Sequence, residues 1–257
     1  MVNVLLDQQY GVAGGAPLRY DLFTPASESP APLVICIHGG GWISGEKEGM
    51  HEVARGLAEL GFAAASPQYR LAPLYPCPAA IDDVQAFIDF AHANAATWGA
   101  DPERIAVLGN SAGGHLACMA GLTRKNVVRA VVDICGITDV TNPREQHFPI
   151  AWEFLDQFMG IPWEGNEEFF KQASPLHHVA SDSPPFLVVH GDVDDIVPVE
   201  QSDALVAALR TRQVPVDYHR LPNEGHALSY GAWEHTFRLV KDFLSQTLNH
   251  AVREPIS

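Results

Sequence analysis

Basic side chains are scarce in this sequence. Its 257 residues include 16 Lys and Arg against 31 Asp and Glu, which gives a formal net charge of −15 with the histidines neutral. Proteins bind nucleic acids and anionic lipid surfaces through clustered Lys and Arg. The composition therefore argues against nucleic acid as a partner. We interpret the excess of acids as ordinary surface charge that favours solubility, rather than as the sign of a cationic substrate.

A long apolar run is also missing. No stretch reaches the roughly 18 consecutive apolar residues of a membrane-spanning helix, so we expect no membrane span. Residues 1–15 lack the basic start of a signal peptide, and Asp7 interrupts their short apolar run. We therefore expect a cytoplasmic protein, although a secreted protein trimmed of its leader would show the same sequence.

Cysteines are few and are not closely spaced. Cys36, Cys77, Cys118 and Cys135 form no C-x-x-C motif, and Cys36 and Cys135 lie within apolar runs. Disulfide-rich scaffolds and zinc sites carry more regular cysteine patterns. We therefore expect buried thiols in a reducing compartment.

Neither histidine pattern in the sequence predicts a metal site. His51 and Glu52 begin like the zinc motif H-E-x-x-H, but position 55 is an arginine. His177 and His178 are adjacent, so their side chains point apart in a strand or about 100° apart in a helix. We interpret this second pair as a surface or lid feature, and we expect no metal and no organic cofactor.

Short apolar runs alternate with longer stretches of helical periodicity. This alternation is typical of β-α units around a mostly parallel sheet. The expected strands are 33–37, 62–66, 105–108, 128–134, 186–190 and 216–221, and the expected helices are 49–60, 79–97, 112–124, 200–212 and 232–248. The first 25 residues are expected to begin the sheet in antiparallel fashion. Since no linker divides the chain, we predict one α/β domain over residues 1–257, with helices on both faces of a sheet of about eight strands.

One segment does not fit the alternation. Residues 141–180 form a connection much longer than the usual few residues. The segment carries seven aromatic side chains: Phe148, Trp152, Phe154, Phe158, Trp163, Phe169 and Phe170. We predict a small helical lid insert, in which most aromatics pack against the domain and some line a substrate pocket.

A candidate nucleophile lies between an expected strand and an expected helix. Gly109-Asn110-Ser111-Ala112-Gly113 follows the strand at 105–108 and opens the helix at 112–124. In a nucleophile elbow the serine sits on a sharp turn of this kind, and flanking glycines avoid collisions across it. A G-x-S-x-G sequence also occurs where a serine merely caps a helix. Its placement after a strand favours Ser111 as a nucleophile.

Three successive glycines follow the strand at 33–37. In the segment from His38 to Trp42, HGGGW, the backbone N–H groups are not shielded by side chains and can converge on one oxygen. A flexible turn or a phosphate-binding loop is the alternative, but neither G-x-G-x-x-G nor the Walker pattern is present. We interpret the segment as part of an oxyanion hole.

Acid and base candidates follow the later strands. Three carboxylates crowd one turn after the strand at 186–190: Asp192, Asp194 and Asp195. Asp139, after the preceding strand, is a further candidate acid. His226 follows the last strand, where a loop can carry an imidazole over the sheet. The chain order Ser, Asp, His suits a catalytic triad.

Together these segments resemble the α/β-hydrolase esterases related to hormone-sensitive lipase, and the neighbouring acetyl- and feruloyl-type esterases. The resemblance covers most of the chain and rests on HGGGW at 38–42, YRLAP at 69–73, GNSAGGHLA at 109–117, SPL at 174–176, HGDVDDIVP at 190–198 and EGHAL at 224–228. It implies an α/β-hydrolase fold and assigns roles to six residues: Ser111 as nucleophile, Asp194 as acid, His226 as base, and the amides of Gly40, Gly41 and Ala112 as the oxyanion hole.

The sequence departs from that family pattern in two respects. Asn110 stands where many members carry Asp, and these 257 residues do not include the larger N-terminal cap of many members. The structure of the lid, and hence the substrate, is therefore not implied by the resemblance.

We predict a serine esterase that acts on a small-molecule ester with a short acyl group, roughly acetyl to butyryl, because a short lid offers little apolar surface to bury a long chain. The alcohol part could be an aryl or a sugar group. The expected substrate contacts are Trp42, Trp152, Phe154 and Trp163. An amidase or exopeptidase would use the same triad, and a ligand-binding receptor on a hydrolase scaffold is the alternative from another class.

Overall fold

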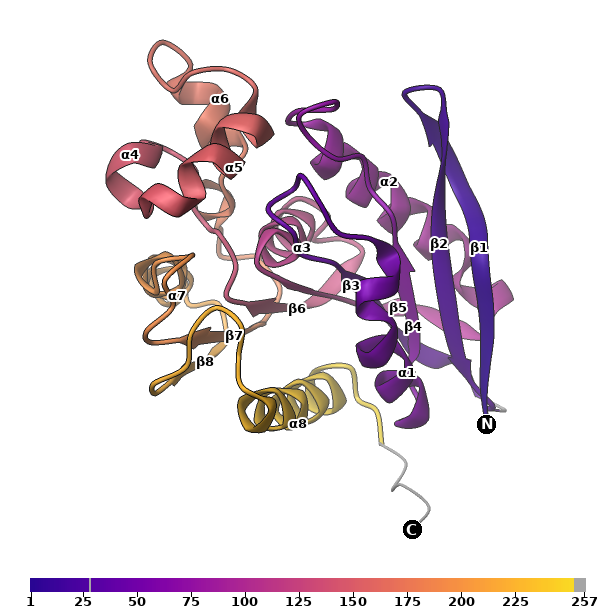
Figure 1. The fold of residues 1–257 in the computed structure, drawn as a ribbon. Coiled ribbons are helices and arrows are strands. Elements are labelled where there is room, and N and C mark those ends of the chain that lie inside the picture. Colours follow the sequence, from indigo (N-terminus) through magenta and orange to yellow (C-terminus); the bar gives the residue numbers. More distant parts are fainter. Residues whose placement is uncertain (28, 252–257) are drawn as a thin grey trace.

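A single sheet of eight strands forms the centre of the molecule (Figure 1). It is seen in a computed structural model that describes residues 1–27 and 29–251. The strand order is β1-β2-β4-β3-β5-β6-β7-β8. The strands are β1 (Val2–Ala13), β2 (Ala16–Pro25), β3 (Ala31–Ile37), β4 (Ala63–Pro67), β5 (Ala100–Asn110), β6 (Val128–Ile134), β7 (Phe186–Gly191) and β8 (Val216–Leu221). Pairing is antiparallel for β1 with β2 and β2 with β4, and parallel from β4 through β8.

Helices cover both faces of this sheet. They are α1 (His51–Glu59), α2 (Ala79–Asn94), α3 (Ala112–Thr123), α4 (Pro143–Gln146), α5 (Pro149–Met159), α6 (Glu167–Gln172), α7 (Glu200–Thr211) and α8 (Tyr230–Thr247), with 3₁₀ turns η1 (Lys47–Met50), η2 (Ala95–Trp98) and η3 (Pro175–His178). Helices α2, α3 and α7 share one hydrophobic cluster with the sheet, and α1 and α8 share a second cluster on its other face. This is the α/β-hydrolase architecture that the sequence predicts.

Strand β3 illustrates why the sheet is covered twice. Leu33 and Ile35 belong to the cluster with α2 and α3, whereas Val34 and Cys36 belong to the cluster with α1 and α8. Side chains alternate between the faces of a strand, so a strand buried on both faces must be apolar at every position. All four cysteines are buried free thiols, as expected.

The first 25 residues form the expected antiparallel start of the sheet. The two-residue turn between β1 and β2 consists of Gly14 and Gly15, which have φ of +59° and +80°. Tight hairpin turns of this type require positive φ at both central positions, and glycine adopts it without steric cost.

Several element ends differ from those expected. Strand β5 begins at Ala100, ahead of the expected 105–108, because Ala31 of β3 pairs with Ala100 before the apolar run starts. The expected helix 79–97 is α2 up to Asn94, followed by the tighter turn η2 that ends at Gly99. Polar or small residues at an element end carry too weak a periodic signal to fix its boundary.

The segment 141–180 contains α4, α5, α6 and η3 and stands at one side of the carboxyl edge of the sheet (Figure 1). Phe158 of α5 stacks on Trp42 with ring centroids 4.2 Å apart. This contact packs the insert onto the loop that follows β3.

No helix within residues 1–27 and 29–251 combines the length and the apolar character needed to cross a membrane. The predicted single domain also covers residues 28 and 252–257, which lie outside the described residues.

Candidate active site

Ser111 occupies the sharp turn between β5 and α3. Its backbone has φ 55° and ψ −125°, a conformation that L-residues rarely adopt. A Cβ at Gly109 would lie 2.1 Å from the carbonyl oxygen of Gly113, and a Cβ at Gly113 would lie 2.2 Å from that of Ile37. The two glycines of the motif are therefore required by close backbone contacts, and the turn presents the Ser111 hydroxyl at the carboxyl edge of the sheet.

His226 lies beside this hydroxyl. Its Nε2 is 3.0 Å from Ser111 Oγ, and its Nδ1 is 2.7 Å from Asp194 Oδ2. The loop after β8 carries His226, and the turn after β7 carries Asp194. The three side chains, which are far apart in the sequence, thus form one hydrogen-bonded chain. If Nδ1 carries the proton and donates it to Asp194, Nε2 is free to accept the Ser111 proton.

The Asp194 carboxylate is fully enclosed by donors. Oδ1 accepts the amides of Ile196 and Val197 at 2.9 and 2.8 Å, and Oδ2 lies near His226 and 3.1 Å from His190 Nε2. Burial alone would raise the pKa of Asp194, but the hydrogen bonds from His190, His226 and Val197 hold it well below its usual value. The carboxylate is therefore ionised throughout the neutral range.

His190 is a residue of this site that the motifs did not identify. It is buried, with Nδ1 2.7 Å from Ser202 Oγ and Nε2 also 3.1 Å from the Val197 carbonyl. These partners fit a tautomer in which Nε2 donates toward Asp194 and Nδ1 accepts the Ser202 hydroxyl proton. His190 thereby fixes the position of Asp194. Its place at the first letter of HGDVDDIVP is the only sequence signal for this role.

The three other candidate acids lie away from the imidazole. Asp192 accepts the amide of Asn223 at 2.7 Å on the surface, and Asp195 is exposed. Asp139 accepts the amide of Thr141 at 2.9 Å. The structure therefore brings only Asp194 of these four carboxylates to His226.

The glycine segment after β3 supplies free amides next to Ser111. Among the described residues, no acceptor is found for the N–H groups of Gly40, Gly41 or Ala112. Gly40 has φ +114°, and a Cβ there would lie 2.3 Å from the Ser44 carbonyl oxygen, so only glycine fits. Unpaired amides beside a nucleophile are the arrangement of an oxyanion hole.

The YRLAP segment holds this glycine loop in place. The Tyr69 hydroxyl donates to the His38 carbonyl at 3.0 Å, and the Ala72 amide donates to the Trp42 carbonyl at 2.9 Å. The ring of Tyr69 also stacks on His38, with centroids 4.2 Å apart. The free amides are therefore fixed before any substrate binds.

A pocket of about 360 Å³ opens above Ser111. Gly40, Gly41, Ser111 and His226 form its polar side, and the insert closes it with an apolar wall of Ala151, Phe154 and Leu155. Phe154 is thus at the place expected of a substrate contact. His147, which the sequence analysis did not single out, also lines this pocket.

Trp42 borders the pocket but is almost entirely buried, with 2% of its surface exposed. Its Nε1 donates to His115 Nδ1 at 3.1 Å, and His115 Nε2 lies 2.8 Å from the Ala173 carbonyl. Burial lowers the pKa of His115 to about 4, so this imidazole is neutral and can accept the indole proton. Trp42 mainly joins the glycine loop to α3 and the insert.

The structure does not bring Trp152 and Trp163 to the Ser111 pocket. Trp152 Nε1 donates to the His147 carbonyl at 3.0 Å, and the Arg144 guanidinium lies over its ring. Trp163 packs edge-on against Phe170 and lines a separate hollow within the insert. Both aromatics hold the insert together, because each has partners within it.

One cluster among the described residues has metal-ligand side chains within reach of one another: Cys135, His190 and Asp194. Its chemistry does not suit a metal. Burial raises the pKa of the Cys135 thiol to about 12, so it stays protonated, whereas metals bind the thiolate. The other two side chains already hydrogen-bond to each other and to their neighbours.

A buried carboxylate, Asp133 of β6, lies against the helix that follows Ser111. It is fully buried, and the Gly136 amide and the Cys118 thiol are the donors beside it. A Cβ at Gly114 would lie 2.4 Å from Asp133 Oδ1. Burial raises the pKa of Asp133 to about 6.

This raised pKa predicts a pH-dependent cost to stability. The contribution of Asp133 to folding is most favourable below its unfolded pKa near 4 and is lost as pH rises through about 6. Asp133→Asn removes the charge, so its free energy of unfolding relative to the unsubstituted protein should rise by roughly 2–3 kcal/mol between pH 4 and pH 7. Urea unfolding at both pH values measures this difference. A difference that did not change with pH would contradict it.

Ester hydrolases are among the known proteins that this chain resembles. The chain is 34% identical over 245 residues to the probable carboxylic ester hydrolase LipM of Mycobacterium tuberculosis, covering 88% of this chain and 57% of LipM. It is also 34% identical over 260 residues to the esterase LipQ of the same organism, covering 94% of this chain and 61% of LipQ. The chain thus spans little more than half the length of these relatives.

A solved structure and a family model extend the comparison. A truncated carbohydrate esterase from gut microbiota superimposes with a TM-score of 0.82 at 25% identity, covering 96% of each chain. Residues 20–209, from β2 to α7, match the BD-FAE family model. The chain therefore belongs to the BD-FAE family.

Proposed function

We propose that this protein is a serine hydrolase that cleaves carboxylic esters through Ser111, His226 and Asp194. The observation that carries the proposal is the continuous hydrogen-bonded chain from Ser111 Oγ through His226 to Asp194 at a strained strand-to-helix turn. The names of LipM and LipQ support ester bonds as the target.

The first half of the reaction forms an acyl-enzyme. His226 Nε2 takes the proton of the Ser111 hydroxyl as Oγ attacks the ester carbonyl, because a neutral hydroxyl is a weak nucleophile. The carbonyl oxygen becomes an oxyanion, which the amides of Gly40, Gly41 and Ala112 stabilise. Loss of one such donor typically costs about 3–4 kcal/mol. The imidazolium then gives its proton to the departing alcohol oxygen as the ester bond breaks.

The second half repeats these steps with water. His226 removes a proton from water, the hydroxide attacks the acyl carbon, and the returned proton releases Ser111 and the carboxylic acid. Asp194 holds the imidazole in one tautomer and stabilises its cation in both halves. The carboxylate stays ionised because its pKa is lowered.

An amidase would use the same residues, and the present structure offers no observation that favours one. A non-catalytic receptor is less well supported, because all three triad side chains are in hydrogen-bond contact.

The pocket above Ser111 leads to a prediction about chain length. Its volume is about 360 Å³, and Phe154 and Leu155 close it. Each buried CH₂ contributes about 0.8 kcal/mol only where a wall exists to bury it. The value of kcat/KM for p-nitrophenyl esters should therefore be highest between acetate and butyrate and should fall for octanoate and palmitate.

A variant sharpens this measurement. Phe154→Ala enlarges the pocket and should move the maximum toward hexanoate or octanoate. A maximum at long chains in the unsubstituted protein would contradict the small acyl pocket, and absence of hydrolysis of every ester in the series would contradict the proposed function itself.

A further inference from the structure

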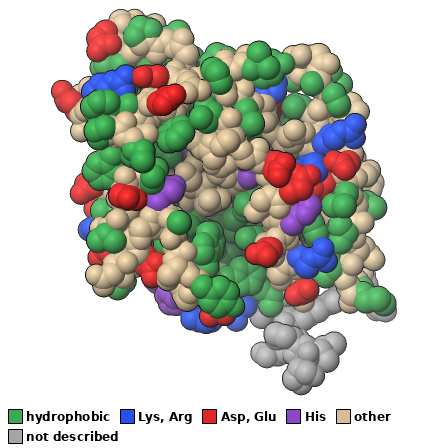
Figure 2. Space-filling view, viewed as in Figure 1, with side chains coloured by type: hydrophobic (Ala, Val, Ile, Leu, Met, Phe, Trp, Pro, Cys, Tyr) green, Lys and Arg blue, Asp and Glu red, His purple; other side chains and the backbone are tan. Residues whose placement is uncertain are grey.

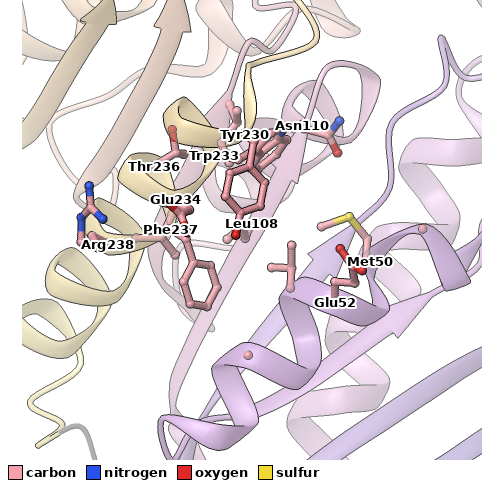
Figure 3. A pocket seen from close by; sticks show the side chains of 15 residues that line it. Met50, Glu52, Leu108, Asn110, Tyr230, Trp233, Glu234, Thr236, Phe237 and Arg238 are labelled. Carbon is pink, nitrogen blue, oxygen red and sulfur yellow. The ribbon is translucent and has the colours of Figure 1, made fainter. Parts of the chain in front are cut away.

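A second and larger cleft lies between α1 and α8. We call it the α1–α8 cleft. Its volume is about 660 Å³, within the usual range for small-molecule sites. Leu108 of β5 and Ile134 of β6 lie at its floor, on the face of the sheet that α1 and α8 cover. Figure 3 shows Asn110 at one end of the cleft and the Phe237 ring further along it.

The lining of the α1–α8 cleft is mainly apolar and aromatic. Met50 and Val53 lie on one side, and Tyr230, Trp233 and Phe237 lie on the α8 side. Tyr230 is 80% exposed and Trp233 is 36% exposed, so these large rings lack a full set of packing partners. Figure 2 shows hydrophobic side chains within a hollow of this face. Such a surface gains free energy when an apolar group covers it.

The α1–α8 cleft lies next to the Ser111 pocket. Asn110 borders both cavities and is joined to Ser111 by one peptide bond. At the opposite end, a Cβ at Gly56 would lie 2.9 Å from the Phe237 ring, so α1 and α8 are in contact there. One end of the cleft therefore lies beside the residue that precedes Ser111, and α1 and α8 approach each other near Gly56.

The geometry of His226 decides which part of an ester would extend into the α1–α8 cleft. The imidazole must protonate the departing alcohol oxygen, so the alcohol leaves from the His226 side. The loop that carries His226 runs directly into α8, whose first turn contributes Tyr230 and Trp233 to the cleft. The smaller pocket, which includes Gly40 and Gly41, then receives the acyl group.

Resting on the proposed esterase function, we infer that the α1–α8 cleft binds the alcohol part of the substrate, and that this part is an apolar alcohol bearing an aromatic ring. The lining is mostly apolar, and it also includes Glu52, Glu234 and Arg238. A phenyl group would cover the apolar part of this surface, whereas the hydroxyl groups of a sugar would lie against it without partners. Trp233 and Tyr230 supply ring faces and edges for the aromatic group.

Two acetate esters test this assignment, because they share the acyl group and have similar leaving groups. If the cleft binds the alcohol part, the short ethyl group of ethyl acetate should make few contacts there, whereas the phenyl group of 3-phenylpropyl acetate should enter it. Trp233→Ala should lower kcat/KM for 3-phenylpropyl acetate by about tenfold through lost ring contact, with ethyl acetate changed less than about twofold.

A variant that fills the cleft tests the assignment of the alcohol part independently. Gly49 lines the cleft, and a Cβ there meets nothing within 4 Å. Gly49→Phe should therefore obstruct the cleft and reduce hydrolysis of 3-phenylpropyl acetate selectively. The matched control is Gly231→Phe, because Gly231 is also exposed with open space at its Cβ but does not line the cleft. The control should leave both rates unchanged.

The outcomes separate the two proposals. If the unsubstituted protein hydrolyses both esters and the ratio of their kcat/KM values stays constant in Trp233→Ala and Gly49→Phe, the cleft assignment is wrong and the esterase proposal stands. The assignment is also wrong if these variants impair long-acyl ethyl esters or an acetylated methyl glucoside instead. If neither ester is hydrolysed, the proposed function fails and the cleft assignment fails with it.

Discussion

Replacing Ser111 by Ala is expected to lower kcat for ester hydrolysis by roughly 10⁴- to 10⁶-fold. In the proposed mechanism the Ser111 oxygen forms the bond with the substrate, and the remaining amides and pocket would give only residual acceleration. Hydrolysis of p-nitrophenyl acetate, measured at saturating substrate and high protein concentration, would detect this residual rate. The fold should be retained, because the Ser111 hydroxyl hydrogen-bonds to the His226 side chain and not to the backbone of the turn.

Ser44 provides the control for this substitution. Its hydroxyl lies in the same pocket but donates to the Gly40 carbonyl at 2.9 Å rather than to the imidazole. Ser44→Ala should therefore retain kcat within about tenfold, since loss of one exposed hydrogen bond costs about 1 kcal/mol. Comparable activity in Ser111→Ala and Ser44→Ala would show that Ser111 is not the nucleophile.

Asp194→Asn is expected to reduce kcat by roughly 10³- to 10⁴-fold. The amide carries no charge to stabilise the imidazolium, and its NH₂ group can hold His226 in the wrong tautomer. The same substitution at Asp139, Asp192 and Asp195 should leave kcat within a few-fold, because none of these carboxylates contacts the imidazole. Loss of activity at one of these three positions, with activity kept in Asp194→Asn, would move the acid to that residue.

The lowered pKa of Asp194 sets the pH range in which its protonation can affect stability and activity. Its pKa is lowered in the folded state, so its stabilising contribution is present above the unfolded pKa and is lost as pH falls through the folded pKa. Protonation of Asp194 therefore cannot explain any loss of activity between pH 7 and pH 5.

The sequence predicted the fold because short, mostly apolar runs mark the central strands and longer stretches of helical periodicity separate them. The same reasoning brought Ser111 and His226 into one hypothesis, since glycines and strand ends surround both. It left several carboxylates as candidate acids, from which the family resemblance selected Asp194. These features are local, so a linear sequence displays them.

The remaining features depend on contacts between distant segments. Trp152 and Trp163 were expected at the substrate, but an aromatic in an insert has no sequence signal that distinguishes a pocket wall from internal packing. His190 is the first residue of the HGDVDDIVP segment, but its role in positioning Asp194 is visible only from the hydrogen bond between the two side chains. The α1–α8 cleft is lined by two helices that are widely separated in the chain, so no local sequence signal reveals it.

The central claim is that Ser111 becomes covalently modified during the reaction. Incubation with diisopropyl fluorophosphate, followed by intact-mass measurement and peptide mapping, tests it most directly. We expect one phosphoryl adduct per chain, on the peptide that contains Ser111, with activity lost in proportion and no adduct in Ser111→Ala. Inactivation without an adduct on that peptide, or with the adduct on another residue, would contradict it.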